Sequence, residues 1–304
     1  KSYSRPNTEV LKNQGRIKLV TIQVPLNISG FWIPHRGRTH EDTGSLGASL
    51  TIEPPAIFKV TRGSCPVYIN SVCIEEYHPV VQELSAAGVS VHGLTPVPLG
   101  VGSAVSGALA IALAYSYLYL KKGVEPDPND VGLLAHKIEV EVGGGLGDVI
   151  CQFVGGGLVL RRKPGPPGIG EAVSIPVEDV EITLGVLRER MTTKEMLARF
   201  TDRFVSIGLE VYRKFTVEPS LISFLKLSKE FSIGVGFMPR ETVEELEVEF
   251  RDLHGVLGYF VKKSLLVVVH KPGISSSIRK IVEKVCCYSL PPFKLSKQGF
   301  TVSL

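Results

Sequence analysis

Two glycine-rich segments contain the residues best suited to binding an anion and moving a proton. The first, Thr95 to Leu120, starts with Thr-Pro-Val-Pro-Leu-Gly-Val-Gly-Ser and continues as an apolar, Ala-rich run. Gly100 and Gly102 allow the backbone to turn tightly, and Ser103 is a residue type that commonly caps a helix. Because the amides of a first helical turn lack intrahelical acceptors, the segment predicts a loop and a helix N-terminus that cradle the phosphates of a nucleoside triphosphate.

The same segment allows two other interpretations. The twenty residues from Val101 to Leu120 carry no charge and are followed by Lys121 and Lys122, a length that also suits a membrane-spanning helix. Small and hydroxylated residues such as Ser106 make the run only weakly lipophilic. The remaining interpretation is an ordinary buried helix entered by a glycine-rich turn.

The second segment is Gly143-Gly-Gly-Leu-Gly-Asp148. Its glycines place Asp148 near the start of a helix that runs towards Phe153, where the helix dipole favours an ionised carboxylate. Such a carboxylate could accept a proton from a substrate hydroxyl or bind a cation, and a helix-capping aspartate is the structural alternative. Upstream, Glu139 and Glu141 stand two residues apart on an expected helix, so they cannot both face one site.

A basic, turn-rich stretch precedes both glycine segments. Residues 27–40 combine glycine and proline with His35, Arg36, Arg38 and His40, which suits a loop that holds an anion or carboxylate and equally a solvated basic loop. The small residues of Gly44-Ser-Leu-Gly-Ala-Ser would let a ligand approach the backbone, or form a plain turn into a strand.

Composition limits the function classes. The chain has 304 residues, of which 44% are hydrophobic and 21% charged, which is typical of a globular protein with a sizeable core. The net charge of +4 is spread along the sequence, so nucleic-acid binding is not indicated, whereas a local anion site is.

The cysteines and the N-terminus bear on the compartment. There are five cysteines with no Cys-x-x-Cys pair, so we expect free thiols in a reducing compartment, with a Cys65–Cys73 hairpin bridge as the alternative. The first twenty residues contain no apolar segment, which predicts no secretory signal and a soluble, cytoplasmic protein.

The elements around these segments predict an α+β protein without an internal repeat. A strand should end at Pro25, and residues 1–15 should form a polar extension. A Pro- and Gly-rich loop at residues 163–170 indicates a boundary between two halves. The other expected strands are 48–52, 57–60, 67–74, 89–94, 155–162, 232–237 and 259–270, and the other expected helices are 79–87, 131–142, 193–214, 219–229 and 275–287, with an acidic segment at 241–249.

Several blocks in this order resemble the GHMP superfamily of small-molecule kinases, and within it the archaeal pantoate kinases. They span about residues 17–168, and the most specific is Gly145-Leu-Gly-Asp-Val-Ile-Cys-Gln-Phe followed by Gly-Gly-Gly-Leu-Val-Leu-Arg-Arg-Lys-Pro-Gly. The resemblance implies a two-domain fold, with a mixed α/β nucleotide-binding domain over residues 16–170 and a ferredoxin-like α+β domain over residues 171–304.

The activity that the resemblance implies is ATP-dependent phosphorylation of the pantoate hydroxyl to 4-phosphopantoate, a step towards coenzyme A in archaea, with Mg²⁺ as cofactor. It implies a small-molecule substrate, no nucleic-acid or membrane partner, and is compatible with a homodimer. The implied roles are Asp148 as base or orienter of the acceptor hydroxyl, Ser103 and Glu139 at the metal, Pro98, Leu99, Gly100, Val101, Gly102 and Ser103 around the ATP phosphates, and Ser29, Gly30, His35, Arg36 and Ser45 around the substrate.

Some positions depart from the superfamily pattern. Leu26 and Asn27 stand where many members have glycine and a basic residue, Ala104 replaces a second serine, and Leu46 stands where pantoate kinases often have arginine. A third superfamily motif is matched at best by residues 232–237. Two alternatives therefore stand beside pantoate: another acceptor such as mevalonate, homoserine or a sugar, and a degenerate member that binds a ligand without catalysis.

Overall fold

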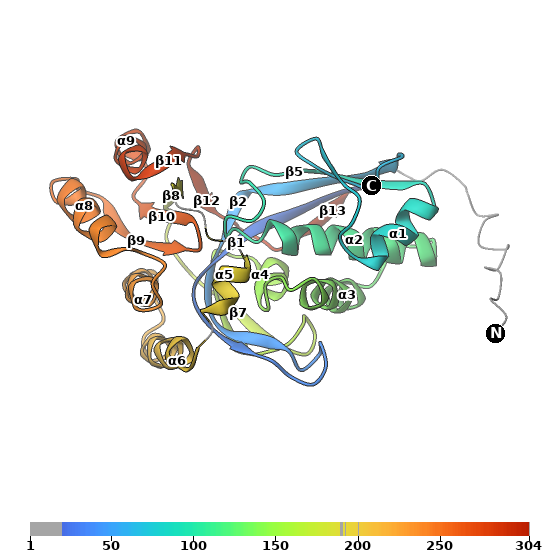
Figure 1. Cartoon of the computed structure of the whole chain (residues 1–304), viewed down its shortest axis with the longest axis horizontal. Coiled ribbons are helices and arrows are strands. Elements are labelled where there is room, and N and C mark those ends of the chain that lie inside the picture. Colours follow the sequence, from blue (N-terminus) through green and yellow to red (C-terminus); the bar gives the residue numbers. More distant parts are fainter. Residues whose placement is uncertain (1–19, 189–190, 192, 200, 304) are drawn as a thin grey trace.

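Two long antiparallel strands, β1 (Val20–His35) and β2 (Gly44–Arg62), run through the middle of the molecule. The structure is a computed structural model that describes residues 20–188, 191, 193–199 and 201–303. The predicted extension at residues 1–15 lies outside this range. Figure 1 shows α1 to α3 on one side of these strands and α6 to α9 on the other.

The sequence prediction for this region was wrong, because the first strand does not end at Pro25. β1 continues to His35, so most of the expected basic loop is strand, and Gly44 to Ser49 also belongs to a strand. The pairing with β2 shifts register at Pro25 and at Gly30. These two residues therefore act as bulges inside a strand whose apolar side chains, including Leu26, Ile28 and Phe31, are fully buried.

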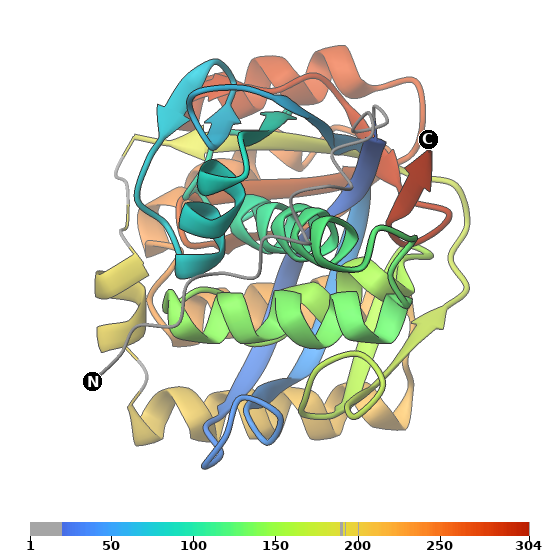
Figure 2. The ribbon, with the colours of Figure 1, turned by 90° about the vertical axis from the view of Figure 1, so that its right-hand side faces the viewer.

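The segments before and after the first glycine loop fold as predicted. Helix α1 (Pro79–Ala86), strand β5 (Val89–Leu94), helix α2 (Val105–Lys122), helix α3 (Pro128–Glu141) and helix α4 (Asp148–Val154) follow one another. The strand expected at 67–74 is instead a hairpin of β3 (Val67–Ile69) and β4 (Val72–Ile74). Helix α2 is buried from Gly107 to Ser116 and lies beside α3 (Figure 2). None of the helices in the described ranges is long and apolar enough to cross a membrane.

The second half of the chain extends the same sheet. Its elements are β6 (Leu158–Lys163), β7 (Glu171–Ile175), β8 (Glu181–Leu187), α5 (Thr193–Ala198), α6 (Asp202–Val217), α7 (Leu221–Gly234), α8 (Arg240–Phe250), β9 (Val256–Lys262), β10 (Leu265–His270), α9 (Ser275–Val285), β11 (Cys286–Ser289), β12 (Phe293–Leu295) and β13 (Thr301–Ser303). The main strand order is β4-β3-β5-β2-β12-β8-β10-β9, while β13 pairs with β1 and β7 with β6. The sheet thus crosses the predicted boundary near residue 170, and the division into two domains stays a prediction.

Two predicted strands of this half were wrong. Residues 232–234 end helix α7 and residues 235–237 form the turn after it, and the hydroxyl of Ser232 donates to the carbonyls of Ser228 and Val261. The run at 259–270 is a hairpin of β9 and β10, in which Lys263 adopts a left-handed φ of 58° at the turn. Lys262, Lys263 and Ser264 separate the two apolar runs of this hairpin, and all three are buried.

The expectation of five free thiols was wrong for one pair. Cys65 and Cys73 form a disulfide across the β3–β4 hairpin, with 6.2 Å between their Cα atoms. Cys151, Cys286 and Cys287 are free. The hairpin register, in which Cys73 lies opposite Tyr68, brings Cys73 close enough to Cys65 for the bridge.

Candidate active site

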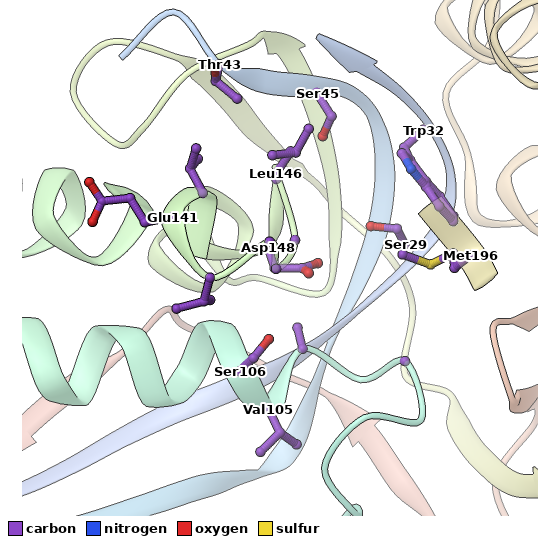
Figure 3. Close-up of a pocket in the computed structure, with 18 of the residues that line it drawn as sticks. Ser29, Trp32, Thr43, Ser45, Val105, Ser106, Glu141, Leu146, Asp148 and Met196 are labelled. Carbon is purple, nitrogen blue, oxygen red and sulfur yellow. The ribbon is translucent and has the colours of Figure 1, made fainter. Parts of the chain in front are cut away.

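A cleft of about 1060 Å³ opens where the two glycine segments meet the ends of β1 and β2 and the β9–β10 turn. Figure 3 shows Asp148 at its centre, Ser106 below it, Ser29, Trp32 and Met196 on one side, and the carboxylate of Glu141 pointing away on the other. The volume is large enough for a nucleotide or a comparable ligand.

The first glycine loop forms one wall of the cleft and leads into α2. Gly100 and Gly102 have φ values of 88° and 122°, which favour glycine. The predicted cap by Ser103 was wrong, because Ala104 occupies the N-cap position in a left-handed conformation with no side-chain cap. The first turn of α2 has no acidic residue of its own, and Ala104, Val105 and Ser106 at its start line the cleft, where a helix N-terminus favours an anion.

Asp148 is the first residue of α4, with Gly147 at the N-cap, so the predicted helix start is confirmed. Its side chain is nearly buried, and its Oδ1 accepts a 2.6 Å hydrogen bond from Nδ2 of Asn27. Nζ of Lys262 lies 3.7 Å from the same oxygen. An amide and an ammonium therefore orient a carboxylate that faces the cleft, the arrangement needed to receive a proton from a bound hydroxyl.

Glu139 lies behind the second glycine segment and is fully buried. Its Oε2 accepts hydrogen bonds from the amide of Gly145, at 2.9 Å, and from the hydroxyl of Ser106, at 3.2 Å. Burial first, and the charge of Asp148 second, raise the pKa of Glu139 to about 7. Glu141, by contrast, is half-exposed and pairs with His78.

The oxygen atoms that line the cleft, together with the Glu139 carboxylate buried behind it, fit a magnesium ion bound together with phosphates. The part of the chain that the structure describes contains no group of three or more His, Cys, Asp or Glu side chains that could hold a metal. Mg²⁺ commonly uses one or two carboxylates and takes its other ligands from phosphate and water. Asp148, Glu139 and the hydroxyls of Ser103 and Ser106 offer such a set, and a cation would relieve the repulsion between the two carboxylates.

Arg161 forms a buried positive charge beside Gly147 of the second glycine segment. Its side chain is 1% exposed, and Nη1 donates to the hydroxyl of Ser49 at 2.5 Å and to Sγ of Cys151 at 3.1 Å. Nη1 also lies 3.4 Å from the hydroxyl of Ser29, while Nε has no partner among the described residues. Arg161 has no acidic partner within 4.0 Å in the described ranges, so this guanidinium is available to an anionic ligand.

The structure gathers some of the predicted site residues at the cleft and leaves others outside it. Leu99, Gly100, Gly102, Ser103, Ser29, Arg36, Ser45 and Asp148 line it. The residues that do not line it are Pro98, Val101, Gly30, His35 and Glu139, the last of which is buried behind the second glycine segment. Gly30 packs against α7, where a Cβ would meet Phe224, and His35 is exposed at the end of β1.

Sequence reasoning missed Asn27, Ser106, Arg161 and Lys262 as site residues. Ser106 follows Ser103 by three residues, a helical spacing that could have indicated it. Arg161 ends an apolar run on a strand, and a charge in such a place is a signal of a buried partner or ligand. Lys262 carries no local signal, since only the fold brings the β9–β10 turn to Asp148.

A comparison with protein families matches the part of the chain that contains both glycine segments. Residues 70–156 match the family model of the GHMP kinases N terminal domain. These residues include the first glycine loop, Glu139 and Asp148. Over this segment the chain is therefore similar to the N-terminal domain of the GHMP kinases.

One curated relative and two solved structures are similar to this chain over most of its length. The pantoate kinase of Methanocaldococcus jannaschii is 25% identical over 276 residues, which cover 86% of this chain and 97% of that protein. A solved structure described as a phosphotransferase related to the CoA biosynthesis pathway is 21% identical, with a TM-score of 0.76 over 94% of this chain and 98% of its own. Another, the MDDEF protein in complex with MVAPP, AMPPCP and magnesium, is 13% identical, with a TM-score of 0.65 over 94% of this chain and 99% of its own. The two structures share the fold of this chain.

Proposed function

We propose that this kinase transfers the γ-phosphoryl group of ATP to the hydroxyl of pantoate. The observation that carries the choice of acceptor is Arg161, a buried guanidinium without an acidic partner in the described ranges, next to the hydroxyls of Ser29 and Ser49. A buried charge is costly unless an opposite charge meets it. The carboxylate of pantoate supplies that charge, and the similarity to a pantoate kinase agrees with it.

In this proposal the acceptor lies between Arg161 and Asp148. The acceptor oxygen attacks the γ-phosphorus, its proton passes to the carboxylate of Asp148, and the bond from the γ-phosphorus to the bridging oxygen breaks as ADP leaves. Asn27 orients Asp148 through the hydrogen bond to Oδ1. The glycine loop and the start of α2 hold the phosphates through backbone amides.

Mg²⁺ would be held by Glu139, Ser103 and Ser106 together with phosphate oxygens, and it would neutralise charge on the phosphates. Asp148 keeps its role as proton acceptor in this assignment. Ser103 supports a ligand role because its hydroxyl is buried and has no partner among the described residues. We place the protein in the cytoplasm, acting on a small-molecule substrate.

A panel of acceptors tests the proposal. Purified protein with ATP and Mg²⁺ is given pantoate, mevalonate, homoserine or galactose, and ADP release is followed by a coupled assay. We expect turnover with pantoate, and loss of that turnover in Asp148→Ala. Turnover with another acceptor alone would reassign the substrate, and calorimetric nucleotide binding without turnover on any acceptor would indicate a non-catalytic member.

A further inference from the structure

We propose that Lys262 is a catalytic residue that donates to the phosphoryl group during its transfer. The inference rests on the kinase activity proposed above, and it assigns a role to a side chain from the C-terminal half of the chain. Lys262 is the last residue of β9, and its Nζ lies 3.7 Å from Oδ1 of Asp148. The ammonium thus lies at the carboxylate that we assign to the acceptor hydroxyl.

The turn that carries Lys262 is fixed against the first glycine loop. The amide of Ser264 donates to the carbonyl of Val101 at 3.3 Å. A Cβ on Gly102 would lie 2.7 Å from the carbonyl oxygen of Lys262, so the two backbones are packed closely. Lys262 therefore lies between the loop that holds the phosphates and Asp148, where a phosphoryl group must pass on its way to the acceptor.

The ammonium retains donors for a ligand. Its side chain is only 9% exposed, and at 3.7 Å the approach to Asp148 is longer than an N–H···O hydrogen bond. Its other described contact is the ring of Trp32, whose centroid lies 5.7 Å from Nζ. Asn27 already supplies a short hydrogen bond to the same carboxylate oxygen. Holding Asp148 in place thus does not by itself account for a buried ammonium at this point.

The neighbouring residue adds to the positive potential of the turn. Lys263 also lines the cleft, and burial, followed by the charge of Lys262, lowers the pKa of Lys263 to about 8. Two lysines side by side in a buried turn favour the arrival of negative charge. In the transferred phosphoryl group that charge is spread over three oxygens, and a donor aimed at it stabilises the transition state more than the ground state.

The test compares Lys262→Met with Lys262→Arg, which retains the charge. The matched control is Lys229→Met, because Lys229 also pairs with a carboxylate, that of Glu247, and lies over an aromatic ring, that of Tyr259, but does not line the cleft. We expect Lys262→Met to lower kcat by about 100- to 1000-fold with less than about a threefold change in the KM for ATP. Lys262→Arg should recover part of the loss, and Lys229→Met should match the wild type.

A binding measurement separates this inference from the proposed function. Lys262→Met should bind ADP with magnesium as tightly as the wild type, but should bind ADP, magnesium and aluminium fluoride, which mimics the transferring phosphoryl group, about 100-fold more weakly. If the wild type phosphorylates none of the acceptors, the proposed function fails, while this measurement still tests Lys262.

Three outcomes would overturn the role of Lys262. They are an unchanged kcat, an effect on KM alone, and equal losses of affinity for ADP with and without aluminium fluoride. Thermal melting checks that each variant is folded. If Lys262→Met does not fold, Lys262→Gln carries the same comparison.

Discussion

Replacing Gly145 by alanine tests how closely the backbone of the second glycine segment must approach Asp148. A Cβ at this position would lie 2.7 Å from Cγ of Asp148 and would overlap its Oδ2. Ordinary van der Waals contact begins at 3.4 Å, so Cγ alone must withdraw by about 0.7 Å, the difference between 3.4 and 2.7 Å, and Oδ2, which lies closer, must withdraw further. A misplacement of about 1 Å at a reacting centre costs about 100-fold in rate. We therefore expect kcat to fall by about 100-fold, or about 2.7 kcal/mol of activation free energy.

The measurement is ADP release at saturating ATP and pantoate, with thermal melting of the same samples. Gly123→Ala is the control, because Gly123 has a φ of 69° with no atom near its Cβ position and does not line the cleft. That variant should lose about 1 kcal/mol of stability and keep its kcat. A folded Gly145→Ala protein with kcat within threefold of the wild type would refute the reasoning that the position of Asp148 limits the reaction.

Three further predictions concern the buried charges and the disulfide. Arg161→Met should raise the KM for pantoate by about 100-fold or more and leave the KM for ATP within about threefold, and equal effects on the two substrates would contradict a carboxylate-binding role. Because the pKa of Glu139 is raised to about 7, the folded state binds more protons than the unfolded state between about pH 4.5 and 7. The free energy of unfolding of the metal-free protein should therefore fall by about 3 kcal/mol over this range relative to Glu139→Gln, as measured by urea denaturation at several pH values, and parallel profiles would refute it. Cys65→Ser should lower the free energy of unfolding by about 2–3 kcal/mol, because it removes the disulfide. Urea denaturation of both proteins without reductant measures this difference, and equal urea midpoints would show that the bridge contributes little.

The local elements were predictable because their signals are local. Strand 89–94 matches β5 to the residue, the helix expected from Pro79 matches α1, and Asp148 begins a helix as its neighbours indicated. Proline and glycine misled the prediction in β1, where long-range pairing with β2 absorbs Pro25 and Gly30 as bulges. A turn signal is thus overridden when both flanking segments gain a partner strand and a buried apolar face.

The site was predictable only as far as its residues lie on continuous motifs. The glycine loop and Asp148 follow one another in sequence and meet at the cleft, whereas Arg161 and Lys262 reach it from β6 and β9. Nothing near Lys262 in the sequence indicates a carboxylate partner. Lys262 can be recognised as a site residue only when the pairing of β9 with β10 and the packing of their turn on the glycine loop are known.

The glycines of the second segment have a further role beside allowing a tight turn. A Cβ on Gly144 would lie within 2.7 Å of the Glu139 carboxylate, one on Gly145 would overlap Asp148, and one on Gly147 would lie 2.7 Å from Nε of Arg161. Each glycine therefore leaves room for one charged side chain. Because these charges are buried, their energies depend steeply on distance, and a methyl group between any of them and the backbone would change the geometry of proton acceptor, metal ligand or substrate anchor. The sequence indicated only that these glycines place Asp148 near a helix start, whereas Gly144, Gly145 and Gly147 together leave the space for three buried charges around one cleft.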